Sequence, residues 1–114
     1  MVGKSKTWTK AQQARARALK EMGCILCREQ GMGWRLPDIH HLLEGGRRMG
    51  HDYTIPLDPW YHEGHPPEGM NPREAKALFG PSLKLHKREF VERFGSELDI
   101  LERVEEQLKR MEAI

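Results

Sequence analysis

Apolar residues recur at helical spacing near both ends of the chain, and a cap residue stands before each run. Thr9 precedes alanines and long straight side chains, which favour a helix over 10–22 that Gly23 ends. Asn71 is followed by proline and, three residues after the cap, by glutamate. This combination predicts another helix over 72–79.

Two more helices are predicted beyond that point. Ser82 can cap a helix that runs to Phe94, and Ser96 can open a last helix with one apolar face. That face favours packing on the rest of the protein, and it could also support a homodimer. Its residues are Leu98, Leu101, Val104, Leu108 and Met111.

Only the middle of the chain predicts strands. Residues 34–41 and 54–57 have the composition of short strands, and a proline in each confines it to an edge or shortens it. Residues 44–52 between them are predicted to be loop, and residues 59–62 open a turn or short helix. The pattern therefore predicts an α+β fold with a small sheet and flanking helices.

The length of 114 residues fits one domain, and 38% hydrophobic with 7% aromatic residues predicts a small core. We divide the chain into a basic tail over 1–8, a compact domain over 9–95 and an amphipathic helix over 96–114. A small core often relies on a metal ion or a partner subunit. The 32% charged residues, the lack of a long apolar run and the lack of a signal-like start predict a soluble, cytoplasmic protein.

The net charge of +2 is unevenly distributed. Residues 1–28 carry seven Lys or Arg against one Glu, whereas residues 96–114 carry three basic and six acidic residues. The basic front end, with Lys10, Arg15 and Arg17, suits a polyanion such as DNA. A solvated helix face with a loose tail would show the same pattern, and charge alone leaves the two interpretations equally open.

Cys24 and Cys27 form a C-x-x-C motif. A structural disulfide is not expected in the cytosol, which leaves a metal knuckle or a redox pair. A thioredoxin-like pair should lie between a hydrophobic strand and a helix of a βαβ unit. That context is missing, so the motif favours metal.

Four of the six histidines fall within residues 38–62. Histidine titrates near neutrality and binds divalent ions, so it suits both the base and the metal ligand in phosphodiester hydrolysis. His40 and His41 should point to opposite faces of a strand, although a strand end or bulge could bring both to one site. His62 follows the second strand and could reach the same ion. For His86, on an apolar helix face, core packing is the commoner role.

Arg47 and Arg48 follow two glycines in the predicted loop. Two guanidiniums on a flexible loop suit the phosphates of a nucleic-acid backbone, and an ordinary exposed turn would look the same. Trp34 and Trp60 could stack on bases, but in so small a domain we expect both in the core.

Together these motifs resemble an HNH endonuclease and, more narrowly, the phage recombination-enhancement nucleases whose DNA cleavage depends on RecA. The resemblance covers about residues 20–95. The motifs that carry it are C-x-x-C, Asp-Ile-His-His-Leu, Gly-Gly-Arg-Arg-Met-Gly-His, Thr-Ile-Pro-Leu-x-Pro-Trp-x-His, Gly-Pro-Ser-Leu and Lys-Arg-x-Phe-x-x-x-Phe-Gly.

The resemblance implies a ββα-metal (HNH or His-Me finger) core and a metal-dependent DNA endonuclease. His41 matches the general base, and His40 matches the first metal position. His62 matches the metal-binding histidine that starts the helical element, and His86 matches a later histidine that serves as a further ligand or phosphate contact. The region of the middle Asn is occupied by His51, Asp52 or Tyr53.

Two positions depart from the family pattern. Relatives tend to carry Cys where this chain has Asp58, and His or Cys where it has Tyr61, which with Cys24 and Cys27 would complete a structural zinc site. Asp58 can bind zinc through oxygen, whereas Tyr61 is a poor ligand. The knuckle could therefore be weak, vacant or completed by another histidine. The implied cofactor for catalysis is a divalent metal, Zn or Mg/Mn.

The implied partners are DNA and a RecA filament, without a membrane, in a bacterial cell and from a phage or prophage gene. The alternative is a catalytically inactive zinc-knuckle module that binds DNA or RecA, which the altered positions 58 and 61 motivate. The intact His40, His41 and His62 argue against it, because a binding module has no need of a general base.

Overall fold

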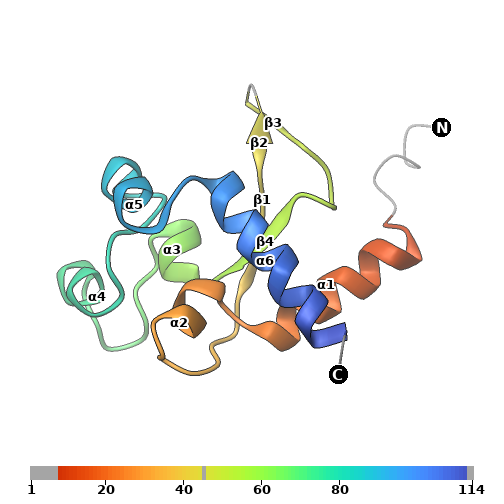
Figure 1. Cartoon of the computed structure of the whole chain (residues 1–114). Helices are drawn as coiled ribbons and strands as arrows, with labels where there is room; N and C mark the ends of the chain where they lie inside the picture. The colour runs from red at the N-terminus through yellow and green to blue at the C-terminus, as the bar shows by residue number, and fades with distance from the viewer. Residues whose placement is uncertain (1–7, 45, 113–114) are drawn as a thin grey trace.

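The computed structural model describes residues 8–44 and 46–112, which fold into helices around a small sheet (Figure 1). The α+β class is as predicted, and none of the described helices is long and apolar enough to cross a membrane. In chain order the elements are α1 (Lys10–Met22), α2 (Ile25–Glu29), β1 (Asp38–His41), β2 (Leu43–Glu44), β3 (Arg47–Arg48), β4 (Thr54–Leu57), α3 (Pro59–Glu63), α4 (Pro72–Phe79), α5 (Lys87–Phe94) and α6 (Glu97–Glu112).

The central pair of strands is antiparallel. β1 pairs with β4, with Asp38 opposite Leu57 and His41 opposite Thr54. All four residues of β4 are buried, and only Asp58 separates this strand from α3. The second strand is found where it was predicted, whereas the first begins at Asp38 and not at residue 34.

A second, smaller hairpin lies where the sequence predicted only a loop. β2 pairs with β3, with Leu43 opposite Arg48. Figure 1 shows this hairpin extending away from the helices, beyond the end of the central strands. Gly46 has a φ of 82°, a conformation that favours glycine, and it allows the chain to reverse within so few residues.

The capping signals correctly located α1 and α4. Thr9 and Gln12 form a reciprocal capping box at the start of α1, and Asn71 and Glu74 form another at α4. The prediction for α5 was wrong, because this helix begins at Lys87 and not after Ser82. The Ser82 hydroxyl accepts two backbone N–H groups from the next turn, so the chain makes a tight turn there before the helix starts.

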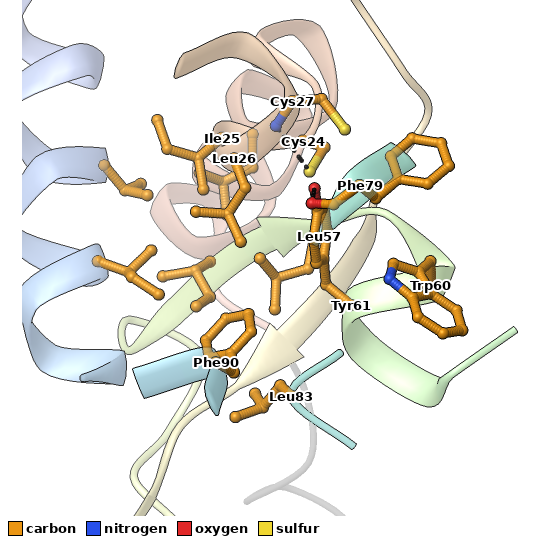
Figure 2. Packing of buried hydrophobic residues seen from close by; sticks show 14 of the residues in the cluster. Cys24, Ile25, Leu26, Cys27, Leu57, Trp60, Tyr61, Phe79, Leu83 and Phe90 are labelled. Carbon is orange, nitrogen blue, oxygen red and sulfur yellow. Dashed lines mark hydrogen bonds between the residues drawn. The ribbon is translucent and has the colours of Figure 1, made fainter. Parts of the chain in front are cut away.

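The core forms where β4, α3 and the C-terminal helices meet (Figure 2). Tyr61 lies edge-on to Phe79 and Phe90, with ring centroids 6.2 and 6.3 Å apart. Ile100 and Val104 of α6 are fully buried in the same core, so the C-terminal helix packs directly on this domain. Burying each such side chain contributes about 1.5–3 kcal/mol.

The prediction that both tryptophans lie in the core is confirmed for Trp60 and wrong for Trp34. Trp60 is fully buried and its indole N–H donates to the Gly80 carbonyl at 2.9 Å, as expected for a core residue. Trp34 is instead 59% exposed. Its indole N–H donates to the Lys20 carbonyl at 3.0 Å, and a Cβ at Gly23 would lie 2.6 Å from its ring, so Trp34 covers the end of α1.

Candidate active site

Two histidines face each other where β1, α3 and α6 meet. The ring centroids of His40 and His62 are 5.1 Å apart. His40 Nε2 lies 2.6 Å from Glu97 Oε1, and His62 Nδ1 lies 2.9 Å from Asp38 Oδ2. Asp38 and His40 are two residues apart on β1 and therefore share a face of the strand. We call these four residues the paired-histidine cluster.

Carboxylates on three sides make the paired-histidine cluster favourable for positive charge. His62 Nε2 also lies 3.4 Å from Glu63 Oε2. The hydrogen bond with His40 lowers the pKa of Glu97, although partial burial opposes the shift. Negative groups beside imidazole nitrogens favour a bound cation.

The side chains of the paired-histidine cluster are of types that bind divalent ions. Imidazole together with carboxylate is a common ligand set for Zn²⁺ and Mn²⁺, and carboxylates that hydrogen-bond ligand histidines fix their orientation. Within residues 8–44 and 46–112, no three His, Cys, Asp or Glu side chains are arranged so that they could enclose an ion as they stand. Binding would therefore require at least one histidine–carboxylate pair to separate.

His41 lies on the opposite face of β1 from His40, as predicted from strand alternation. Its Nε2 is 2.9 Å from Nδ1 of His51. Burial lowers the pKa of His41, and the positive charge of Arg48 lowers it further. A lowered pKa keeps the ring unprotonated at neutral pH, which is the state that can accept a proton.

His86 is placed differently from the other predicted site histidines. Its Nδ1 accepts the Ser82 N–H at 3.1 Å, and its ring centroid is 6.1 Å from that of Trp60. It stands at the start of α5, where it makes no hydrogen bond to His40 or His62 in the part of the chain described. Its contacts are those of a residue that shapes a turn.

The C-x-x-C motif lies at the start of α2, with both cysteines buried. Figure 2 shows the two sulfurs near Tyr61 and Phe79. The Cys27 N–H donates to Cys24 Sγ at 3.4 Å. Burial raises the pKa of Cys24, but hydrogen bonds from Cys27 and from the backbone of Asp58 and Leu26 together lower it below its usual value. The hydrogen bond to Cys24 raises the pKa of Cys27.

The other two residues of the knuckle already have partners. Asp58 is buried, and its two oxygens accept from Arg35 Nε at 2.7 Å and from the Trp60 N–H at 2.9 Å. The Tyr61 hydroxyl donates to the Phe79 carbonyl at 2.7 Å. Two thiols remain, whereas a structural zinc site takes four ligands. These residues do not fit a closed zinc knuckle.

The basic residues predicted to bind DNA fall into two groups. Arg47 and Arg48 are exposed on β3, and Lys10 and Arg17 are exposed on α1. The Arg15 side chain is only 14% exposed and pairs with Glu105 at 2.7 Å. Arg15 therefore joins α1 to α6 within the protein.

Three residues of the site were not predicted from the sequence to take part in it. Asp38 could have been found, because it is two residues before His40 and strand alternation puts both on one face. Glu97 is 57 residues from its partner His40, and no local pattern links them. His51 was noted only as one of three residues in the region of the missing Asn.

A histidine cluster beside an exposed basic hairpin is the arrangement expected of an enzyme that acts on nucleic acid. Residues 8–109 match the family described as recombination enhancement, RecA-dependent nuclease, and the chain belongs to this family. The match spans most of the chain and establishes the class of enzyme as a nuclease. No curated protein and no solved structure matches the chain.

Proposed function

We propose that the protein is a metal-dependent, HNH-type endonuclease that cleaves DNA phosphodiester bonds during recombination, with a RecA filament as its partner. The observation that carries this proposal is the pairing of His40 on β1 with His62 on α3, whose ring centroids are 5.1 Å apart, with His41 next to His40 on the other face of the short strand β1. The paired strands β1 and β4 and the helix α3 come along the chain in the order strand, strand, helix, which is the order of a ββα-metal core. Membership of a RecA-dependent nuclease family supports the proposal.

In this proposal His41 is the general base. A base must take a proton from water as the water attacks phosphorus, and general-base catalysis typically contributes 10²–10⁴-fold to the rate, in order-of-magnitude terms. The lowered pKa of His41 keeps its imidazole in the accepting form. The hydrogen bond to His51 restricts the orientation of the ring.

His40 and His62 would hold the divalent ion, and Asp38 and Glu97 would orient them or join them as ligands. Both carboxylates already hydrogen-bond the histidines, and at least one of these hydrogen bonds would have to open for the ion to bind. When bound, the ion supplies neutralisation of the charge on the phosphate and on the leaving oxygen. Zn²⁺ and Mn²⁺ suit this donor set best, with Mg²⁺ favoured where carboxylates dominate.

The DNA backbone would lie along the β2–β3 hairpin and the exposed face of α1. Arg47 and Arg48 can each contact a phosphate, and Lys10 and Arg17 extend the positive surface. Contacts to phosphates position DNA without reading its sequence. We therefore expect weak sequence preference, with the place of cleavage set by the RecA partner.

A metal titration tests the assignment of the ion site. The assay follows cleavage of a plasmid paired with a RecA filament, after chelation and return of Mg²⁺, Mn²⁺ or Zn²⁺. Loss of a partner that only orients a metal ligand typically costs about 10–100-fold in metal affinity. Because His40→Ala and His62→Ala each remove a ligand itself, we expect them to require a metal concentration higher by more than that, or to lose cleavage. His65→Ala, a change at an exposed histidine outside the cluster, is the matched control and should cleave as wild type.

Cleavage that survives chelation would contradict the metal requirement. An unchanged metal dependence in His40→Ala and His62→Ala would remove these two residues from the ion site.

A further inference from the structure

The contact between His41 and His51 restricts the hydrogens that the two rings can carry. Their facing atoms, Nε2 of His41 and Nδ1 of His51, are 2.9 Å apart, which is a hydrogen-bond distance. A hydrogen bond between two imidazole nitrogens needs one N–H and one lone pair. One of the two rings must therefore donate and the other must accept.

The two arrangements have opposite consequences for His41. If His41 donates from Nε2, its neutral ring carries the lone pair on Nδ1, which can accept a proton from water. If His51 donates, Nδ1 of His41 carries the hydrogen and its Nε2 lone pair is used by the bond. In that arrangement His41 has no lone pair left for water. Only the first arrangement is compatible with a general base.

His51 is itself held in place from several directions. Its ring stacks on Trp8, with centroids 3.8 Å apart and planes 25° from parallel. Its carbonyl accepts from the Thr54 hydroxyl at 3.1 Å, and Arg15 donates to that hydroxyl oxygen at 3.2 Å. Trp8 thus holds the ring of His51, and Thr54 with Arg15 of α1 holds its backbone.

We infer that His51 is a positioning residue for His41: its Nδ1 accepts the Nε2 hydrogen of His41 and leaves the lone pair on Nδ1 of His41. The inference rests on the proposed role of His41 as the base. His51 does not touch the reacting atoms in this scheme. It sets which nitrogen of His41 accepts the proton, and Trp8 holds His51 for that purpose.

Two substitutions of His51 distinguish the effect of its hydrogen bond to His41 from the effect of its stacking on Trp8. His51→Phe keeps a flat ring against Trp8 but removes the acceptor, whereas His51→Asn restores an acceptor oxygen near the place of Nδ1. We expect the single-turnover cleavage rate of His51→Phe to fall about 10–100-fold, the usual cost of losing a partner that orients a site residue. DNA affinity should stay unchanged, and His51→Asn should recover most of the rate. His65→Phe is the matched control and should cleave as wild type.

A long-range ¹H–¹⁵N NMR spectrum at alkaline pH tests the same inference without any cleavage. It reports which nitrogen of His41 carries the hydrogen. We expect the hydrogen on Nε2 in wild type and in His51→Asn, and a mixture of the two forms in His51→Phe. A hydrogen on Nδ1 of His41 in wild type, or full cleavage by His51→Phe, would overturn the inference. If His41 carries its hydrogen on Nε2 but the protein does not cleave DNA, the proposed function is refuted and the inference about His51 stands.

Discussion

At the scale of single residues, Arg35 pairs with the carboxylate of the C-x-x-C region. Arg35 binds the Asp58 carboxylate at 2.7 Å, and its guanidinium carbon lies 5.0 Å from the centre of the Phe79 ring. The Asp58 side chain is only 4% exposed, and Arg35 is the cation that lies against it. The guanidinium thus pairs with the carboxylate that the sequence suggested as a zinc ligand.

Replacing Arg35 by Met should therefore destabilise the fold. The change leaves a buried carboxylate with one hydrogen-bond donor fewer and no neutralising charge. Because Arg35 is itself partly exposed, we expect a loss of about 1–3 kcal/mol in the free energy of unfolding. Urea denaturation followed by circular dichroism measures it. The double variant Arg35→Met/Asp58→Asn should recover part of the loss, and a single variant as stable as wild type would show that the pair does not stabilise the knuckle.

At the scale of elements, local signals located the helices whose caps are made by nearby residues. Thr9 and Asn71 each bond a backbone N–H three residues later, so their helices could be placed from the sequence. The start of α5 could not, because Ser82 has the same chemistry but uses it in a tight turn. The β2–β3 hairpin was missed because strands this short carry no periodic pattern.

The same hairpin makes a prediction about DNA binding. Arg47 and Arg48 are exposed on β3, in an element that extends away from the helices (Figure 1). Replacing both by Ala should weaken binding to DNA of any sequence. It should also reduce the slope of log affinity against log salt by about 2, one for each phosphate that the variant no longer neutralises. Fluorescence anisotropy at several salt concentrations measures both quantities.

The control for that experiment is Arg88→Ala, because the Arg88 side chain is 92% exposed on α5 and we assign it no contact with DNA. Its salt slope should match that of wild type. Equal slopes for all three proteins would show that DNA does not bind along the β2–β3 hairpin.

At the scale of the whole molecule, the candidate site combines residues that the sequence could suggest with residues that only the fold brings together. His40, His41 and His62 could be proposed from their types and spacing around two strands. Glu97 reaches His40 because Ile100 and Val104 anchor α6 on the core. Such a contact depends on packing between distant segments, and no local pattern specifies it.

The measurement that tests the central claim most directly compares wild type with His41→Ala. Single-turnover cleavage of plasmid DNA is measured in the presence of RecA filaments and a divalent ion, and DNA affinity is measured on the same preparations. We expect His41→Ala to bind DNA as wild type does and to cleave about 10²–10⁴-fold more slowly, because it lacks the base. Undiminished cleavage by His41→Ala would contradict the account, and binding without cleavage by wild type would identify an inactive binding module.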